Sequence, residues 1–138
     1  MMKVVKEDYV NFETAKLLKE KGFDVYGDGS FGSETKVWME YSPTGKINDV
    51  STSRPHPKAY PAPTFQMAMK WLREKCYCHI VIDYTFKADA NLSEEYVSYC
   101  FRVENAKTYI QHAHNKWYST YEEACEAAIK YCLTNLIE

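Results

Sequence analysis

Strong net charge is missing from this 138-residue sequence. Its 17 lysines and arginines nearly balance 19 aspartates and glutamates, for a formal charge of -2. Because nucleic-acid binding needs clustered positive charge, this balance argues against a polyanion as the main partner. Hydrophobic residues make up 46% of the chain, which is typical of a globular protein and too many for a disordered one.

Long apolar runs are also missing. No stretch of the sequence approaches the roughly 20 apolar residues of a membrane span, and residues 1–16 contain no apolar core of a secretory signal. The sequence therefore favours a cytoplasmic protein with no membrane partner. We expect its five cysteines to be reduced, because cytosolic thiols stay reduced and an odd count disfavours a disulfide framework.

No motif for catalysis or cofactor binding is complete. Residues 27–32 (GDGSFG) match the letters G-x-G-x-x-G, but a dinucleotide site needs a strand before the glycines and a helix after them. Here a helix is predicted before them and a strand after. The same glycine pattern also occurs in the phosphate-binding loop of protein kinases, but the other motifs of that family are absent from this sequence. We therefore predict a glycine-rich loop and no cofactor.

Two short segments contain cysteines or histidines, which are common metal ligands, at residues 76–79 (CYCH) and 112–114 (HAH). Structural zinc sites usually separate paired cysteines by two to four residues, and no second cysteine pair is suitably spaced. Cys125 lies near a predicted helix start, where a thiolate can be stabilised, but three neighbouring glutamates oppose its ionisation. The sequence predicts neither a metal site nor a cysteine nucleophile.

Three capped, amphipathic helices are predicted. The first begins at Asn11 and ends at Gly22, a residue that suits the left-handed end of a helix. The second, residues 64–75, begins at Thr64 and has an apolar stripe. The third, residues 119–136, opens with a capping box formed by Ser119 with Glu122 or by Thr120 with Glu123.

Strand patterns occupy the segments between the helices. Residues 35–41 and 47–50 predict a hairpin with a turn at 42–45. Residues 78–86, 96–104 and, with weaker alternation, 108–116 predict an antiparallel meander whose second turn is at 105–107. Residues 51–63 contain four prolines, which predict an extended connector without regular structure.

These elements predict one α+β domain over residues 1–138, with residues 51–63 as an internal connector. Its architecture is two-layered, with an antiparallel sheet and helices packed mainly on one face. The order is a helix, a hairpin and then α-β-β-β-α.

The best polar cluster that the sequence offers is Asp83, Arg102, His112 and His114. These residues could meet on the sheet face away from the helices if the strand register permits, and such groups can perform acid–base catalysis. An ordinary solvated face is the competing interpretation and the one that we favour. An enzyme using this cluster therefore stays an alternative function.

A nucleic-acid-associated protein is a further alternative. It would use the N-terminal lysines Lys3, Lys6, Lys16, Lys19 and Lys21. The α-β-β-β-α order resembles that of the double-stranded RNA-binding domain, which presents lysines to phosphates at the start of its last helix. Here residues 119–123 read STYEE, whose carboxylates would repel RNA. The resemblance thus argues against that activity.

Three segments resemble an uncharacterised family of short hypothetical proteins from gut anaerobic bacteria and their phages. They are NFETAKLLKEKGF (11–23), YPAPTFQMAMKWLREK (60–75) and YSTYEEACEAAIKYCLTNLI (118–137). The family has no established activity, so the resemblance implies no site residue. It implies an accessory protein of a phage or mobile element.

Aromatic residues are plentiful, at 15% of the chain with twelve tyrosines. Tyrosine suits interfaces because its ring can be buried while its hydroxyl group remains solvated. The sequence therefore favours a small, soluble, non-enzymatic accessory protein that acts through protein–protein contact. Its partner is expected to be another protein or a second copy of the chain.

Overall fold

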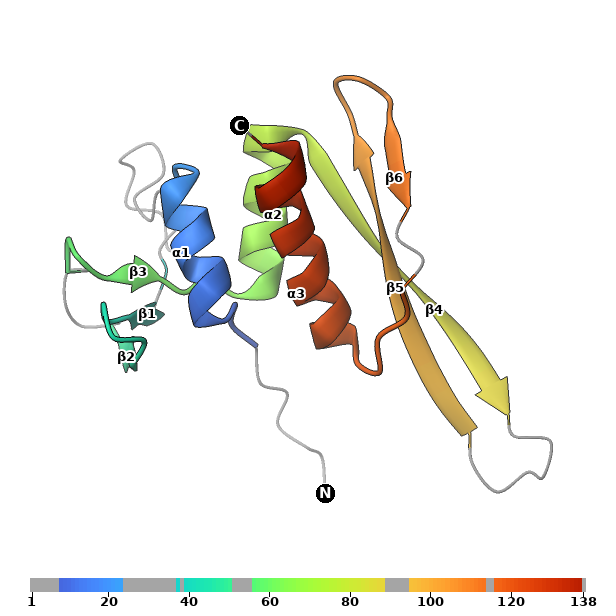
Figure 1. Cartoon of the computed structure of the whole chain (residues 1–138), viewed down its shortest axis with the longest axis horizontal. Coiled ribbons are helices and arrows are strands. Elements are labelled where there is room, and N and C mark those ends of the chain that lie inside the picture. The colour runs from blue at the N-terminus through green and yellow to red at the C-terminus, as the bar shows by residue number, and fades with distance from the viewer. Residues whose placement is uncertain are drawn as a thin grey trace. The chain divides into compact units, whose positions relative to one another are not determined.

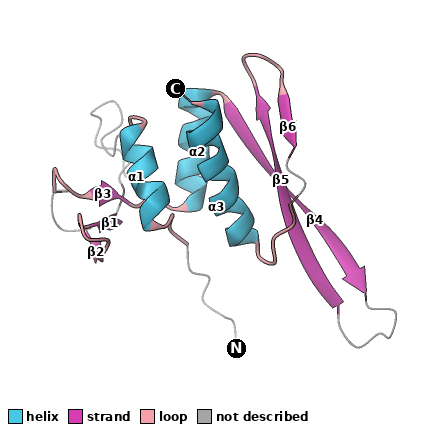
Figure 2. Cartoon of the chain, viewed as in Figure 1, coloured by secondary structure: helices cyan, strands magenta, loops and turns pink. Residues whose placement is uncertain are grey.

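The computed structural model describes residues 8–23, 37, 39–50, 56–88, 95–113 and 116–137. Over these ranges the fold is α+β, with three helices and two antiparallel three-stranded sheets (Figures 1 and 2). The predicted fold class and order of elements are confirmed. The chain divides into two compact units, residues 1–68 and 69–137, and its organisation as one domain stays a prediction.

Helix α1 (Phe12–Glu20) has both predicted ends. The Asn11 side chain accepts a hydrogen bond from the Thr14 amide at 2.9 Å, which caps the first turn. At the other end Gly22 has a φ of 96°, and the amides of Gly22 and Phe23 donate to the carbonyls of Lys19 and Leu18. These two bonds form a Schellman motif, which explains why the helix ends at a glycine.

The first sheet packs with α1 inside the first unit. Its strands are β1 (Met39–Tyr41), β2 (Ile47–Asp49) and β3 (Tyr60–Pro61), in the order β2-β1-β3. The Phe12 ring meets the rings of Tyr41 and Tyr60 edge-on, with centroids 5.5 and 5.6 Å away. The predicted hairpin is confirmed for β1 and β2. Positions 35, 36 and 38 lie outside the described residues.

The connector at residues 51–63 was predicted to lack regular structure, and this is wrong for its last part. Tyr60 and Pro61 pair with Tyr41 and Glu40 as strand β3. Proline has no amide hydrogen to donate to a ladder, but β3 lies at the edge of the sheet, where strands tolerate it. Residues 51–55 lie outside the described part of the connector.

Helix α2 (Phe65–Cys76) begins after Thr64, whose hydroxyl accepts a hydrogen bond from the Met67 amide at 3.1 Å. The predicted apolar stripe is buried at Phe65, Ala68, Met69 and Leu72. Tyr77, which has a left-handed φ of 61°, follows the helix and redirects the chain into the next strand.

The second sheet is the predicted meander, in the order β4-β5-β6. Its strands are β4 (Cys78–Ala88), β5 (Glu95–Asn105) and β6 (Gln111–Ala113). The third strand is shorter than predicted and the turn before it is longer. The Asn105 side chain accepts hydrogen bonds from the amides of Lys107 and Thr108, and Tyr109 turns the chain with a φ of 62°. This asparagine turn occupies residues that the alternation pattern assigned to a strand.

Helix α3 (Tyr121–Tyr131) packs on β4 and β5 and continues as a π-helical turn, Cys132–Leu136. Thr120 is the N-cap, because its hydroxyl accepts a hydrogen bond from the Glu123 amide at 3.1 Å. Of the two predicted capping residues, Thr120 is therefore the one that caps the helix. Its buried residues include Ala124, Ala128 and Cys132, whose side chains are small.

Candidate functional site

The second sheet has two faces that differ in character, because side chains alternate along each strand. The inner face, which α3 covers in part, carries Ile80, Ile82, Tyr84 and Phe86 from β4, opposite Val103, Phe101, Tyr99 and Val97 from β5. The outer face carries His79, Val81, Asp83 and Thr85, opposite Glu104, Arg102, Cys100 and Ser98.

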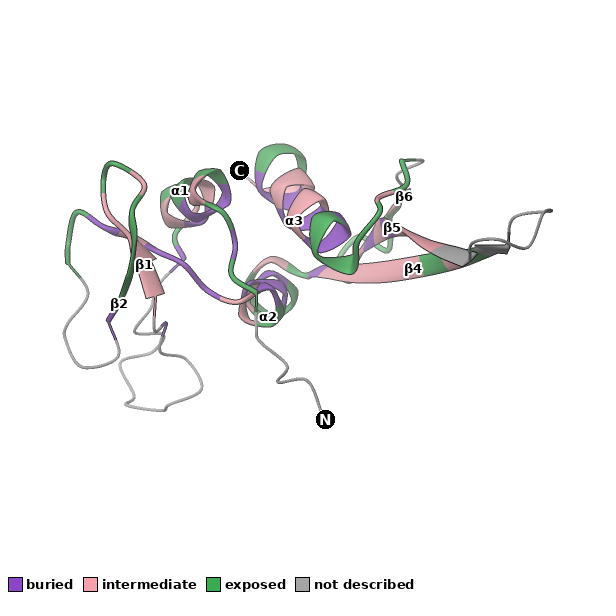
Figure 3. Ribbon diagram, turned by 90° about the horizontal axis from the view of Figure 1, so that it is seen from below, coloured by how far each residue is buried: buried purple, intermediate pink, exposed green. Residues whose placement is uncertain are grey.

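The inner face changes from buried to exposed along the β4–β5 hairpin. Phe101 is only 2% exposed, and its ring lies 5.8 Å from that of Tyr131 in α3. Further along β4, Tyr84 is 71% exposed and Phe86 is 56% exposed. Figure 3 shows this part of β4 extending beyond α3 in the second unit. The change occurs because α3 begins at Tyr121, beside Tyr99, and covers only the first half of β4.

We call the exposed part of this face the aromatic tip surface. It consists of the exposed residues Tyr84, Phe86 and Tyr121 and the half-buried residues Val97 and Tyr99. Tyr84 pairs with Tyr99 and Phe86 pairs with Val97 across the strands, while the Tyr121 ring meets Tyr99 edge-on with centroids 6.0 Å apart. The surface is therefore continuous across β4, β5 and the start of α3. Scattered exposed apolar residues are ordinary, but a contiguous group of this kind often marks an interaction site.

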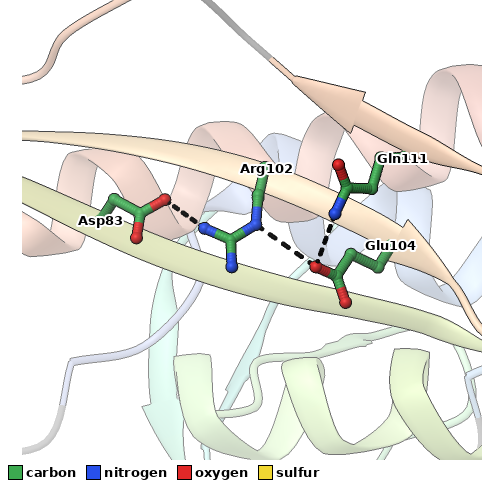
Figure 4. Close-up of polar contacts among 4 residues, drawn as sticks. All are labelled: Asp83, Arg102, Glu104 and Gln111. Atoms are coloured by element: carbon green, nitrogen blue, oxygen red, sulfur yellow. Dashed lines mark hydrogen bonds and ion pairs between the residues drawn. The ribbon is translucent and has the colours of Figure 1, made fainter.

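The outer face holds a ladder of polar contacts (Figure 4). Arg102 binds the Asp83 carboxylate at 2.5 Å and the Glu104 carboxylate at 3.3 Å, and Gln111 donates to the same oxygen of Glu104 at 3.0 Å. The hydrogen bonds to Asp83 and Glu104 raise the pKa of Arg102 above its usual value. These charged groups therefore satisfy one another along the strands.

The four predicted polar residues do not all meet. Asp83 and Arg102 do, and they are joined by Glu104 and Gln111, which the prediction missed although Glu104 follows Arg102 by two residues. The prediction is wrong for His112, which pairs with Val103 and so lies on the inner face, with its ring 6.2 Å from Tyr131. A shift of one residue along a strand moves a side chain to the opposite face. His114 lies outside the described residues.

Burial limits the reactivity of three of the five cysteines. Cys78, Cys125 and Cys132 are buried, and burial raises the pKa of Cys125 to about 11, with Glu122 and Glu126 acting in the same direction. A nucleophilic cysteine needs the opposite shift. In the described part of the chain, no group of three histidine, cysteine, aspartate or glutamate residues could hold a metal ion. Residues 27–32 lie outside that part.

A shallow pocket of about 290 Å³ lies beside the turn between β5 and β6. It is lined by His79, Glu104, Asn105, Ala106, Tyr109 and Gln111. The Glu104 carboxylate in it is already bound by Arg102 and Gln111, and Tyr109 is 91% exposed. The pocket therefore neither encloses a ligand nor offers it a free charged group.

Two of the lysines that were predicted to bind nucleic acid make contacts within the first unit. Lys19 donates hydrogen bonds to the carbonyls of Pro57 and Ala59 at 2.9 and 2.8 Å, and the Lys16 ammonium lies 4.5 Å from the centroid of the Phe12 ring. Lys3 and Lys6 lie outside the described residues. The contacts of Lys19 weaken the case for a phosphate-binding surface here, because they hold its ammonium against the protein.

Comparisons with protein-family models, with curated proteins and with solved structures gave no match. Within the described ranges, none of the helices has both the length and the apolar character needed to cross a membrane.

Proposed function

We propose that this protein is a small, non-enzymatic accessory protein that acts through protein–protein contact, and that the aromatic tip surface makes the contact. The observation that carries this proposal is the exposure of Tyr84 and Phe86 on the strand face that elsewhere forms the core. The resemblance of three segments to short proteins of gut anaerobes and their phages supports an accessory role.

Energetics support a protein partner for this surface. An aromatic side chain can bury about 150–250 Å², and apolar burial stabilises by about 25 cal/mol per Å². Tyr84 and Phe86 are both more than half exposed, so covering the two could contribute on the order of 4 kcal/mol. Aromatic residues of this kind often supply most of the affinity at an interface.

The polar groups support binding over catalysis. On the outer face, Asp83 and Glu104 are paired with Arg102, and His112 lies on the opposite face. The one thiol near a helix start, Cys125, has a raised pKa. None of these arrangements presents a poised acid, base or nucleophile to a substrate, among the residues that the structure describes.

The proposal can be tested by site-specific photo-crosslinking in cells of the native host. Phe86 is replaced by a photoreactive phenylalanine analogue, and the matched control carries the same analogue at Tyr109. Tyr109 is at least as exposed but lies in the turn after β5, away from the aromatic tip surface. We expect position 86 to give discrete protein adducts that position 109 does not give.

Protein adducts from position 86, whether with another protein or with a second copy, support the proposed contact. Equal labelling from positions 86 and 109, adducts with nucleic acid, or no adducts at all would contradict it. Adding Tyr84→Ser, which removes a neighbouring ring of the same surface, should reduce the yield from position 86.

A further inference from the structure

The free edge of β4 is a second feature of the same hairpin. Among the residues that the structure describes, β4 of the β4-β5-β6 sheet pairs on one side only, with β5. It is 11 residues long and pairs one-to-one with β5 from Cys78 to Ala88, so it contains no bulge. Its sequence contains no proline. Long edge strands without these protective features are templates for pairing with another chain.

The sequence of β4 is complementary to itself in one antiparallel register. If a two-fold axis passes beside Thr85, Thr85 faces its own copy and Tyr84 faces Phe86 on the inner face. Position 83, which is acidic, then faces position 87, which is basic in the sequence. Threonine pairs, aromatic pairs and opposite charges are all favourable directly across strands.

Neighbouring registers are less favourable. An axis beside Asp83 places two carboxylates directly opposite each other, which is destabilising. An axis beside Tyr84 pairs position 83 with Thr85 and position 87 with Val81, so that neither charge meets an opposite one. Because Asp83 also binds Arg102 within its own sheet, the preference for the axis beside Thr85 rests on the threonine and aromatic pairs as well as on charge.

We propose that a second copy of this chain is the partner, and that the two copies pair edge to edge through β4 with a two-fold axis beside Thr85. Two three-stranded sheets then join into one continuous sheet, through an interface that uses the same residues in both copies. This inference rests on the proposed function, because it names the partner whose strand lies beside Tyr84 and Phe86.

The size of the contact predicts a reversible dimer. A standard interface buries about 1,200–2,000 Å² in total, and a short strand ladder covers only a narrow strip. The exposed rings of Tyr84 and Phe86 from both copies add apolar area beside that ladder. We therefore expect a small interface with a dissociation constant on the order of micromolar.

Cysteine crosslinking tests the register. Directly opposed residues in an antiparallel pair have Cα atoms about 4.5–5.5 Å apart, which is within the range for a disulfide. With diamide as the oxidant, Thr85→Cys should give a covalent dimer on a non-reducing gel. Ser98→Cys is the matched control, because Ser98 pairs with Thr85 on β5 and shares its face but lies one strand away from the axis.

A charge substitution tests the association itself. Thr85→Lys should weaken the dimer by about tenfold or more in sedimentation velocity, because two lysines then face each other across the axis. Ser98→Lys adds the same charge to the same face of the hairpin and should leave the dissociation constant within about twofold. Circular dichroism of both variants checks that they fold.

A wild-type protein that stays monomeric at high concentration would overturn the dimer. The proposed register would be overturned if Thr85→Cys formed no more covalent dimer than Ser98→Cys, or if the two lysine variants associated equally. If the protein is a monomer and position 86 crosslinks only to a different protein, the proposed dimer is overturned. The proposed function, which is contact with a protein, then still holds.

Discussion

At the scale of single residues, burial decides what the thiol of Cys125 can do. Its position near the start of α3 is one at which the helix dipole favours a thiolate. The side chain is nevertheless fully buried, and desolvation raises its pKa to about 11 from the ordinary value of 9.0. Desolvation therefore outweighs the helix dipole, and the thiol is a neutral part of the core at neutral pH.

This raised pKa predicts an alkaline loss of stability. Because the folded pKa lies above the unfolded one, the contribution of Cys125 is complete below pH 9.0 and declines as pH rises towards about 11. The loss should be on the order of 3 kcal/mol. Urea unfolding of the wild type and of Cys125→Ala across this range measures it. Two stability curves that stay parallel would contradict the prediction.

At the scale of elements, short-range signals place the helix ends. Asn11, Thr64 and Thr120 each accept a hydrogen bond from the amide of the third residue of their helix, and Gly22 ends α1 in the left-handed region. These contacts involve residues close in sequence, so their pattern is readable without a tertiary structure. They also predict how α1 responds to substitution.

Gly22→Ala should destabilise the protein by about 1 kcal/mol. The φ of Gly22 is 96° and an added Cβ would meet no atom within 4 Å, so backbone strain is the only expected cost. Gly22→Asn is the matched control, because asparagine tolerates the left-handed region better. Chemical denaturation should rank wild type first, asparagine second and alanine third. An alanine variant as stable as the wild type would show that this end of α1 is not strained.

Strand faces illustrate the limit of such local signals. His112 was predicted on the outer face with Arg102, but the turn at residues 106–110 shifts the parity of β6 and brings His112 opposite Val103. The length of that turn depends on the hydrogen bonds of Asn105 to Lys107 and Thr108. One residue of difference in a loop therefore decides which face a side chain joins.

At the scale of the whole molecule, each compact unit has buried apolar residues of its own. Val10, Ala15, Leu18 and Ala62 are buried in the first unit, and Phe101, Val103, Ala128, Ile129 and Leu133 are buried in the second. Local opening in one unit can then occur at a different free energy from opening in the other.

Two core variants test this division. Leu18→Ala and Ile129→Ala should each cost about 2–5 kcal/mol, because both side chains are fully buried. In native-state hydrogen exchange, Leu18→Ala should increase exchange mainly in α1 and nearby residues of the first unit. Ile129→Ala should increase exchange mainly in β4, β5 and α3. Equal increases throughout the described residues for either variant would mean that the units open as one.

The sequence by itself determined the fold class, the order of the elements and the ends of the helices. Periodicity and caps are properties of residues close in sequence, so they can be recognised without knowledge of distant contacts. The sequence also identified Asp83 and Arg102 as members of a polar cluster, because both occupy regular strands whose pairing follows from the hairpin.

Only the tertiary structure decided which residues of that hairpin are covered. Tyr84 and Phe101 have the same alternation in sequence and share the inner face, yet one is exposed and the other is buried. The difference arises because α3 spans only part of the hairpin's length, and the place where a helix lies on a sheet depends on packing between residues far apart in the chain. For that reason the aromatic tip surface and the free edge of β4 emerged only from the folded molecule.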